Sequence, residues 1–308
     1  MKFFLSSIFF IVLFLTGCRD RDKDGKILDT TTSGSIKIAV DESLKPLIEA
    51  EIDAFEGIYR EAHIEATYTS ELDAINALLN DSVRLAIVTR KLTPDEQSIL
   101  DRAKIPGLQM SIAKDGIALI VHNENPDSLL RWDHLQGILE GTISNWNQIN
   151  QSSLSDDIEV VFDHPNSGIL RYLRDTLKNI KTIPPNCFAV NSNEAVIAYV
   201  SKKKSAIGLI GVGWVSDSED STANSFLKSV RVAAVSRESE FYQPYQAYMA
   251  QNLYPLSREV IIISREARSG LGSGFLTYVA SDKGQRVVLK AGLVPVTMPV
   301  RIVEINYN

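Results

Sequence analysis

Residues 161–175, VFDHPNSGILRYLRD, contain the change of pattern from which the fold can be predicted. An apolar, β-branched run ends at Phe162 and gives way to the polar turn HPNSG, residues 164–168. The leucines that follow are spaced three and four residues apart, as on one face of a helix. The stretch therefore predicts a strand, a tight turn and a helix whose first backbone N–H groups lie near Ser167 and Gly168.

The turn at Ser167 and Gly168 is compatible with two roles. Unpaired N–H groups and the positive end of the helix dipole can hold an anion without help from Lys or Arg. Asn, Ser and Gly are also common residues at the start of a helix, so an ordinary N-cap would have the same sequence. This stretch alone leaves both roles open.

Segments with strand and helix patterns alternate along the rest of the chain. Helical periodicity follows most of the apolar runs that predict buried strands, which include 35–40, 85–88, 116–121, 206–210 and 260–263. Such alternation indicates an α/β protein with parallel strands.

Three of the predicted strand-to-helix turns are rich in Ser, Thr or Asn, and they contain Ser43, Thr89 and Ser167. In open α/β sheets, ligands bind beyond the carboxyl ends of the strands. These three turns are therefore candidate ligand-binding positions.

The N-terminus has the layout of a bacterial lipoprotein signal. Lys2 precedes an apolar run, 3–15, that is shorter than a membrane span, and the sequence then continues Leu-Thr-Gly-Cys to Cys18. This resembles a lipobox, so residues 1–17 are predicted to be a signal peptide and Cys18 the lipid-bearing residue. A plain signal peptide followed by a coincidental Cys is the alternative. Residues 18–34 are mostly polar and predict a flexible tether.

Composition and motifs argue against several classes of function. The chain has a formal net charge of -6 and no basic block, which argues against a nucleic-acid partner. The only cysteine besides Cys18 is Cys187, which we expect to be a buried thiol, so no intramolecular disulfide is predicted. The sequence lacks a nucleophile elbow and the common zinc-binding motifs, so we expect no enzyme, no metal site and no cofactor.

Seven segments resemble the periplasmic phosphate-binding proteins that supply ABC transporters, which have the type II solute-binding fold. These segments are GSIKIAVDESLKPL, LAIVTRKL, DGIALIVHNENP, LQGILEGTISNWNQI, HPNSGILRYLRD, SAIGLIGVGW, and NLYPLSREVIIISR continuing to FLTYVASDKGQRVVLKAGLVP. GTISNW and SDKGQ…AGLVP are the most specific of them. The resemblance covers residues 35–295.

The resemblance implies a two-lobed α/β fold of the periplasmic-binding-protein type, with mixed sheets, helices on both faces and a hinged cleft that closes on an anion. Lobe I would comprise residues 35–121 and 237–303, and lobe II residues 122–236. The ligand would be inorganic phosphate or a similar anion, delivered to an ABC permease and ATPase complex. The protein would be a monomer in the cell envelope, anchored to a bacterial membrane by the lipid on Cys18 and facing the periplasm or the outside.

Members of this family hold phosphate through backbone N–H groups, Ser and Thr hydroxyls, one Arg and one carboxylate. By the resemblance, the first contact pair falls on Ser43 and Leu44, and a hydroxyl at a helix start falls near Ser70. A strand-end position falls on Thr89 and Arg90. These five residues are predicted ligand contacts.

The family's loop R-x-x-x-S-G-T falls on DHPNSGI in the opening stretch, and it predicts contacts from Asn166, Ser167 and Gly168. Two positions depart from the family. Asp163 stands in place of the Arg, and Ile169 stands in place of the Thr, so one cation and one hydroxyl are lost. Both residues are retained as candidate contacts.

The well-known members use a carboxylate that accepts the proton of phosphate, and they reject sulfate because it has no proton to give. The family's carboxylate position carries Arg90 in this chain. Asp163, Asp41 or Glu42 would then take the role of proton acceptor.

One hypothesis is that Arg90 and Asp163 form a charge-swapped pair across the cleft, with their charged groups within about 8 Å, the reach of a direct or single-water contact. The alternatives are that Arg90 pairs with Asp95 or Glu96 at the surface and that Asp163 is only a turn residue.

The altered loop also leaves a second function open. A sensor or scaffold lipoprotein of the same fold, with a different ligand or none, would retain the two lobes and lose the family's phosphate contacts.

Overall fold

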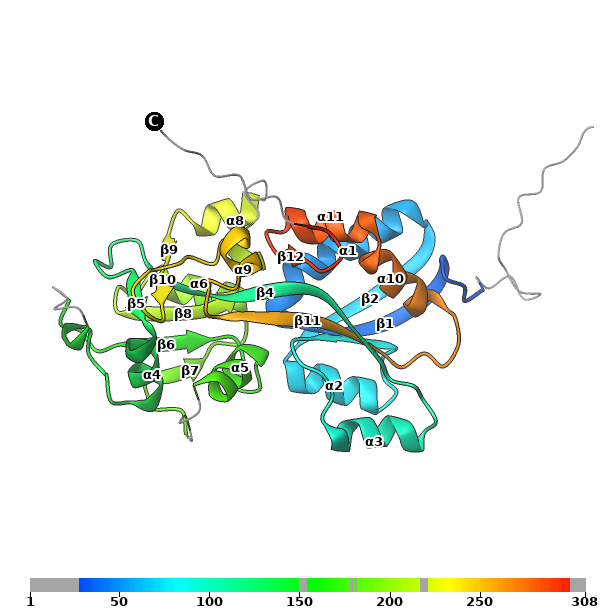
Figure 1. Ribbon diagram of the computed structural model, residues 1–308, viewed down its shortest axis with the longest axis horizontal. Coiled ribbons are helices and arrows are strands. Elements are labelled where there is room, and N and C mark those ends of the chain that lie inside the picture. Colours follow the sequence, from blue (N-terminus) through cyan, green and yellow to red (C-terminus); the bar gives the residue numbers. More distant parts are fainter. Residues whose placement is uncertain (1–27, 150–153, 178–179, 181, 217–220, 300–308) are drawn as a thin grey trace, which may run out of the picture.

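The computed structural model describes residues 28–149, 154–177, 180, 182–216 and 221–299. The predicted signal peptide, Cys18 and most of the predicted tether lie outside these residues. No helix in the described part of the chain has the length and hydrophobicity needed to cross a bilayer. Two α/β lobes lie side by side and are joined by two long strands (Figure 1).

Lobe I is a sheet with helices on both faces. Its strands are β1 (Ser33–Asp41), β2 (Glu61–Thr69), β3 (Leu85–Val88), β11 (Ser257–Ser264), the first part of β4 (Leu108–His122) and β12 (Val294–Pro295). Its helices are η1 (Glu42–Leu44), α1 (Lys45–Ile58), α2 (Glu71–Leu79), α3 (Pro94–Arg102), α10 (Leu271–Ala280) and α11 (Asp282–Lys290). Strand β1 pairs in parallel with β2 and β3, whereas β11 is antiparallel to β3 and β4.

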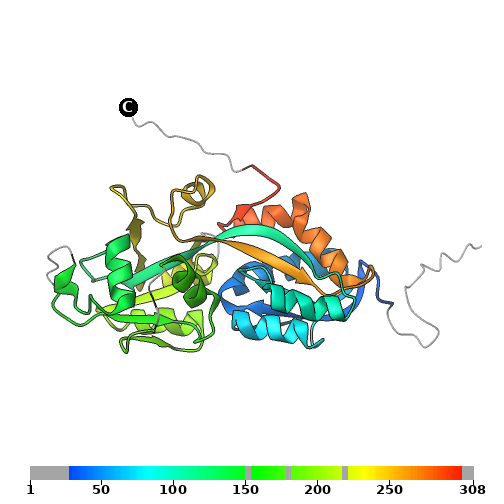
Figure 2. The same cartoon turned by 60° about the horizontal axis from the view of Figure 1, so that its bottom comes forward.

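Successive side chains of β1 and β3 point to opposite faces of this sheet. Ile38 and Ile87 belong to the core that includes α1 and α10, while Ala39 and Val88 pack with α2 on the other face. Helices α2 and α3 come forward in Figure 2. Both faces are buried at the C-terminal part of β1 and along β3, which explains the apolar runs 38–40 and 85–88.

Lobe II is a second sheet with its own core. Its strands are β6 (Glu159–Phe162), β7 (Cys187–Ala189), β8 (Ala206–Gly211), β9 (Val230–Val232), the end of β4, and the separate pair β5 (Leu129–Arg131) and β10 (Ala234–Ser236). Its helices are α4 (Trp132–Glu140), η2 (Trp146–Gln148), α5 (Gly168–Thr176), α6 (Asn193–Val200), α7 (Gly213–Ser216), α8 (Ser221–Phe226) and α9 (Gln246–Ala250). Strand β6 is parallel to β7 and β8, and β8 is antiparallel to β4.

Residues 161–175 form the end of β6, the predicted turn and most of α5, so the strand–turn–helix prediction is confirmed. The α/β class with mixed sheets and helices on both faces is confirmed as well. Cys187 is a buried free thiol, as expected.

Strands β4 and β11 run from one lobe toward the other (Figure 2). The first part of β4 pairs with β11, whereas Ile117–Val121 pairs with β8, so the two sheets share one strand. The lobe II core begins at Ile117 and includes Tyr254 and Leu256. Residues 117–121 and the residues just before β11, Tyr254 and Leu256, therefore pack in the core of lobe II. The lobe boundaries expected at 121/122 and 236/237 do not coincide with the positions at which the chain passes from one core to the other.

The end of the predicted tether belongs to the folded body. Strand β1 already begins at Ser33. Asp29 accepts a hydrogen bond from Arg84 Nη1 at 2.5 Å and another from the Leu271 backbone N–H at 3.0 Å. A flexible tether would thus have to end before Leu28.

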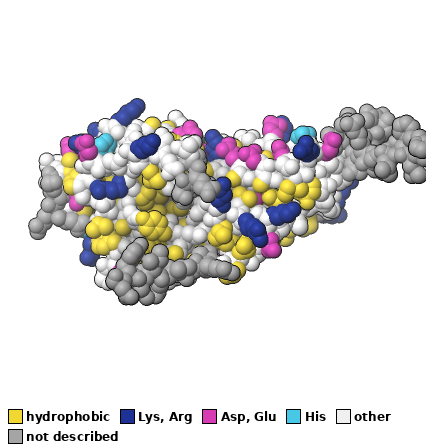
Figure 3. All heavy atoms as spheres, turned by 90° about the horizontal axis from the view of Figure 1, so that it is seen from above, with side chains coloured by type: hydrophobic (Ala, Val, Ile, Leu, Met, Phe, Trp, Pro, Cys, Tyr) yellow, Lys and Arg dark blue, Asp and Glu magenta, His cyan; other side chains and the backbone are white. Residues whose placement is uncertain are grey.

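Figure 3 shows the face of the molecule that carries α8 and α11. Side chains of both charge signs are interspersed on it, and hydrophobic side chains gather over lobe II. A hollow of about 400 Å³ in lobe II is lined by Val215, Leu227 and Tyr245, among others.

Candidate functional site

The polar turns that follow β1, β3 and β6 meet where the two lobes touch. Gly168, the first residue of α5, lies so close to lobe I that an added Cβ would overlap Asp41 Oδ2 and lie 2.9 Å from Thr89 Oγ1. Gly211 makes a similar approach, because its Cβ would overlap the carbonyl oxygen of Ser43. The three turns that the sequence singles out therefore converge in one cleft.

On the lobe I side, Asp41 and Ser43 form a hydrogen-bonded unit at the end of β1. Asp41 Oδ1 accepts hydrogen bonds from the backbone N–H of Ser43 at 3.0 Å and from its hydroxyl at 2.7 Å. The Ser43 hydroxyl also accepts a hydrogen bond from Arg258 Nη2 at 2.7 Å. Leu44, the other member of the predicted contact pair, buries its side chain in the lobe I core. Only Ser43 of the pair presents its side chain to the cleft.

Arg258 is a buried cation at the start of β11, with 4% of its surface exposed. It donates from Nε to Asp115 Oδ2 at 3.0 Å, and Nη2 lies 2.9 Å from the same oxygen. Burial lowers the pKa of Arg258, but Asp115 and Asp41 raise it by more, so the guanidinium stays charged. Its Nη1 atom has no hydrogen-bond partner among the described residues. The cleft therefore contains a fixed positive charge with donor capacity to spare.

On the lobe II side, Asp163 and Ser167 form a comparable unit after β6. The Ser167 hydroxyl donates to the Asp163 carboxylate and accepts from the Ile169 backbone N–H at 3.1 Å, which caps α5. Asp163 is 2% exposed, and its Oδ1 atom has no hydrogen-bond partner within the described ranges. Asp163 is thus a buried acid in the cleft. This is the environment expected of a residue that accepts a proton from the ligand, one of the roles considered for Asp163.

Asp41 and Asp163 have raised pKa values. Burial raises the pKa of Asp41 to about 7, with Glu71 and Asp163 adding to the shift and Arg258 opposing it. Burial likewise raises the pKa of Asp163 to about 6, against the hydrogen bond from Ser167. Both carboxyls can therefore exchange a proton near neutral pH. The described residues contain no group of three or more His, Cys, Asp or Glu side chains arranged to hold a metal ion.

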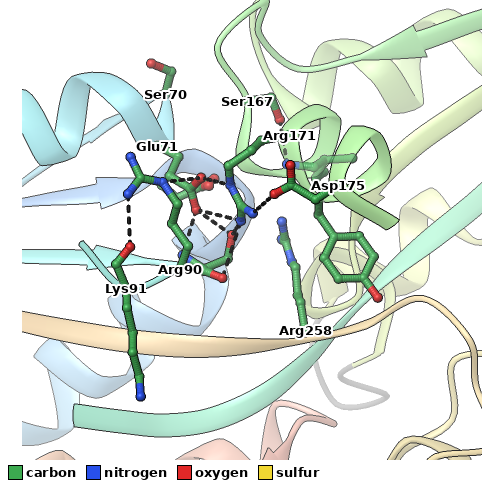
Figure 4. A network of polar contacts seen from close by, with 12 residues as sticks. Ser70, Glu71, Arg90, Lys91, Ser167, Arg171, Asp175 and Arg258 are labelled. Atoms are coloured by element: carbon green, nitrogen blue, oxygen red, sulfur yellow. Dashed lines mark hydrogen bonds and ion pairs between the residues drawn. The ribbon is translucent and has the colours of Figure 1, made fainter. Parts of the chain in front are cut away.

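The centre of the cleft is a bridge between Glu71, at the start of α2 in lobe I, and Arg171, on α5 in lobe II (Figure 4). Glu71 Oε2 accepts from Arg171 Nε, and Glu71 Oε1 accepts from Arg171 Nη2 at 3.3 Å. Thr89 adds two donors to Oε1, its backbone N–H at 2.9 Å and its hydroxyl at 2.5 Å. Burial raises the pKa of Glu71, but the hydrogen bonds from Arg171 and Thr89 lower it by more, so the net shift is downward. Glu71 is therefore a buried carboxylate that stays ionised.

Arg90 makes no direct ion pair with Asp163 among the described residues, so the hypothesis of a charge-swapped pair in direct contact is wrong. Its Nη1 and Nη2 atoms each donate to Glu96 at 2.7 Å, and its Nε lies 3.8 Å from Glu71 Oε2. Glu96 is held close by its own place in the capping box of α3, where it accepts from the Thr93 backbone N–H. The alternative pairing of Arg90 with Glu96 is confirmed.

Three further predicted contacts have local structural roles. The Ser70 hydroxyl caps α2, accepting from the Asp73 backbone N–H at 3.2 Å and donating to Asp73 Oδ2 at 2.6 Å. Ile169 is buried in the lobe II core. The Asn166 backbone N–H donates to His164 Nδ1 at 3.2 Å within the turn, and the Asn166 side chain is exposed at the edge of the cleft.

The mouth of the cleft is a cavity of about 220 Å³ between the starts of α2 and α5. Arg90, Arg171 and Arg174 line it, together with the carboxylates of Glu71 and Asp175. Three Arg residues from two lobes thus line one small cavity, an arrangement that suits an oxyanion.

A second carboxylate of lobe I also reaches a helix start in lobe II. Glu42 accepts hydrogen bonds from the backbone N–H of Asn193, the first residue of α6, at 3.0 Å and from the Asn193 side-chain amide. Asn193 Oδ1 in turn accepts from the Gly211 backbone N–H at 3.1 Å. Glu42–Asn193 is therefore a second contact between an acid of one lobe and a donor of the other, besides Glu71–Arg171.

Sequence reasoning missed Glu71, Arg171 and Arg258. Arg171 lies inside the opening stretch, but the family's loop ends at Ile169, two residues earlier. Arg258 carries one weak signal, a charge at the start of a strongly apolar strand. Its pairing with Asp115 depends on the register of β11 against β4, which the sequence does not reveal.

A model of the PBP superfamily domain matches residues 28–283 of the chain. Among curated proteins, the chain is 22% identical over 289 residues to the phosphate-binding protein PstS of Pseudomonas aeruginosa, which covers 88% of this chain and 85% of that protein. It is 24% identical over 286 residues to PstS of Borreliella burgdorferi, covering 90% of this chain and 92% of that protein.

Among solved structures, the chain resembles a substrate-binding protein of Clostridium perfringens, assigned to a phosphate ABC transporter and solved with bound phosphate. The TM-score is 0.73 at 24% identity, over 86% of this chain and 100% of that chain. An ABC-type phosphate transport receptor of Vibrio cholerae gives a TM-score of 0.64 at 22% identity, over 85% of this chain and 100% of that chain. These likenesses show the fold, which is the type II fold that the sequence predicts.

Proposed function

Because the chain belongs to the PBP superfamily, we propose that it captures inorganic phosphate, or a related oxyanion, between its two lobes and delivers it to an ABC permease. The phosphate-binding proteins PstS of Pseudomonas aeruginosa and Borreliella burgdorferi match this chain over 88% and 90% of its length. The division into two lobes with a ligand cleft between them is part of the same proposal.

The observation that carries the proposal is the set of donors that meet from both lobes. Thr89 supplies a backbone N–H and a hydroxyl from lobe I, and Arg171 supplies a guanidinium from lobe II. Arg258 stands behind Ser43 with an unused Nη1. Guanidinium and N–H donors aimed at one point bind oxyanions strongly, since hydrogen bonds to a charged acceptor are about twice as strong as neutral ones.

The buried acids supply a chemical basis for choosing between anions. Asp41 and Asp163 each have a carboxylate oxygen without a partner in the described part of the chain. An ionised carboxylate can accept the proton of hydrogen phosphate, whereas sulfate has no proton and would meet like charge. Asp41 or Asp163 would therefore take the discriminating role that Arg90 does not take.

The test is a calorimetric titration of a soluble form, residues 19–308, with phosphate and with sulfate, alongside melting curves. This form retains Asp29, whose contacts belong to the folded body. We expect heat and an upward shift of Tm with phosphate and neither with sulfate. The proposal is rejected if millimolar phosphate gives no heat and no shift.

Attachment to the membrane is a separate part of the proposal. Cys18 would carry the lipid, with residues 1–17 removed as a signal peptide. Expression of the full chain in a bacterium should place it in the membrane fraction, and Cys18→Ser should release it. A Cys18→Ser protein that stays in the membrane fraction would contradict the lipid anchor.

A sensor or scaffold of the same fold is the second candidate, and the acidity of the cleft favours it. Asp41, Glu71 and Asp163 are all buried there, and Asp163 stands where the family has an Arg. The same titration separates the two, because a scaffold without an anion ligand would give no response to phosphate.

A further inference from the structure

The Glu71 carboxylate is bonded as a bound oxyanion would be. Its two oxygens take the backbone N–H and hydroxyl of Thr89 and two nitrogens of Arg171, and Arg90 Nε lies 3.8 Å away. These donors come from both lobes, and they include Thr89, one of the two strand-end residues at which the resemblance predicts ligand contacts. Figure 4 shows Arg90 and Arg171 directed toward Glu71 from two sides.

We propose that Glu71 is an internal anion that occupies the oxyanion donors of the cleft, and that a ligand anion binds by displacing it from Thr89 and Arg171. The identity of that ligand, inorganic phosphate, rests on the proposed function. The occupation of the donors by Glu71 does not depend on the proposed function.

The position of Glu71 in its helix explains why its charge is tolerated there. It is the first residue of α2, where the helix dipole favours a carboxylate. A negative charge that served only the dipole could point to solvent, as charged side chains in a first turn commonly do. Glu71 instead points into the cleft, with its side chain 3% exposed, and its strongest partner belongs to the other lobe.

An anion can reach the donors from the mouth of the cleft without Glu71 and Arg171 first having to separate. The cavity of about 220 Å³ at the mouth is lined by Glu71 itself, by Arg90 and by Arg171 and Arg174. An anion can therefore meet the guanidinium groups at the mouth and exchange with the carboxylate one hydrogen bond at a time. Glu71 would move toward the solvent as the anion moves inward.

Two consequences follow from competition within one molecule. The apparent dissociation constant of the ligand equals the constant of the free site divided by the fraction of time that the donors are free. If Glu71 holds the donors about 99% of the time, the ligand therefore binds about 100-fold more weakly than it would bind the free site. Glu71 also replaces the ligand as the bridge between lobes, so removing its carboxylate should loosen lobe I from lobe II.

The experiment compares the wild-type soluble form with Glu71→Ala, which removes the carboxylate, and Glu71→Gln, which keeps the shape and removes the charge. Glu96→Gln is the matched control, since Glu96 is a carboxylate paired with Arg90 but is not among the residues that line the cleft mouth. Circular dichroism confirms that each variant folds. Phosphate affinity is measured by calorimetry, and the radius of gyration is measured by X-ray scattering in phosphate-free buffer.

We expect Glu71→Ala to bind phosphate at least tenfold more tightly than wild type, with Glu71→Gln also tighter and Glu96→Gln within twofold. We also expect a larger radius of gyration for Glu71→Ala without phosphate. If wild type binds phosphate and both Glu71 variants bind it equally or more weakly, the inference is overturned while the proposed function stands.

If none of the four proteins binds phosphate, the proposed function fails and scattering decides the inference. A larger radius of gyration for both Glu71 variants than for wild type and Glu96→Gln would then support Glu71 as the anion that holds the lobes together. Equal radii would overturn it.

Discussion

Each lobe ends a strand of the cleft with a buried Asp whose carboxylate is bonded to a nearby Ser, and the two units differ in what stands behind the Ser. In lobe I, Ser43 connects Asp41 to the buried guanidinium of Arg258. In lobe II, Ser167 connects Asp163 to the first turn of α5, whose N–H groups carry only a partial positive charge. The same Asp–Ser motif therefore places Asp41 near a full positive charge and Asp163 near the start of a helix.

Burial is the largest cause of the raised pKa of both Asp41 and Asp163, and their hydrogen-bonding and charged partners only adjust it. Asp41 has the closer cation, yet its pKa is the higher of the two, at about 7 against about 6, because it is fully buried and lies near Glu71 and Asp163. Because the cleft contains several buried carboxylates, an anion can bind only where hydrogen-bond donors outnumber them. That condition is met beside Thr89 and Arg171.

Removing the cation of lobe I, Arg258, should have the largest effect on the free energy of unfolding. Arg258→Ala leaves Asp115 buried and unpaired, and breaking a buried pair from one side costs about 3–5 kcal/mol of unfolding free energy. Urea denaturation measures the loss. The double variant Arg258→Met with Asp115→Asn should recover part of it, and a loss below about 1 kcal/mol for Arg258→Ala would contradict the role of this pair.

The next effect concerns pH and tests the two acids separately. A folded-state pKa above the unfolded value of 3.8 means that the folded protein keeps protons that the unfolded chain has released, so stability falls as pH rises from about 4 to the folded pKa. Asp41→Asn should remove a pH-dependent loss on the order of 2–4 kcal/mol that ends near pH 7. Asp163→Asn should remove a smaller loss that ends near pH 6.

Denaturation curves at several pH values, taken as differences from wild type, measure both. The difference is needed because burial also raises the pKa of Glu51, to about 9, which adds a slope of the same sign. Parallel pH profiles for wild type and Asp41→Asn would contradict the raised pKa of Asp41.

Gly168→Ala should separate binding from folding. Its Cβ would overlap Asp41 Oδ2 and lie 3.0 Å from Glu71 Oε1, so the lobes could not approach as closely. We expect phosphate affinity to fall at least tenfold, about 1.4 kcal/mol, with little change in Tm. Gly57→Ala is the control, because nothing lies within 4 Å of its Cβ. Equal phosphate affinity in Gly168→Ala and wild type would contradict the close approach of the lobes during binding.

The smallest effect should follow from Arg90→Ala. Its pair with Glu96 is partly exposed, and such pairs contribute about 1 kcal/mol or less to stability. A loss of stability above about 2 kcal/mol would mean that Arg90 supports the cleft in a way that its contacts do not explain.

The α/β class and its strand–turn–helix units could be predicted from local signals in the sequence, whereas the two-lobed type II fold was implied by the resemblance to a family. The end of β6, the turn and the start of α5 each depend on residues a few positions apart, as do the cap of α3 and the apolar run of β11. The boundary between the lobes could not be predicted as well, because it depends on which core Tyr254 and Leu256 join, and that is a long-range choice.

The site was predictable in part for the same reason. Ser43, Thr89 and Ser167 follow strands directly, and all three lie at the cleft. Arg90 was expected to pair with Asp163 because these two residues stand at the family's carboxylate and Arg positions, but its side chain donates to Glu96 in its own lobe. Glu71 was overlooked because a Glu at the start of a helix is the ordinary expectation, and only the arrival of Arg171 from the other lobe gives it another role.

A crystal structure of the soluble protein grown with phosphate would show whether a ligand displaces Glu71. We expect phosphate oxygens within hydrogen-bond distance of the Thr89 backbone N–H and the Arg171 guanidinium, with the Glu71 side chain turned away toward the mouth of the cleft. A structure in which phosphate is bound elsewhere, or in which Glu71 keeps its bonds to Thr89 and Arg171 in saturating phosphate, would contradict this expectation.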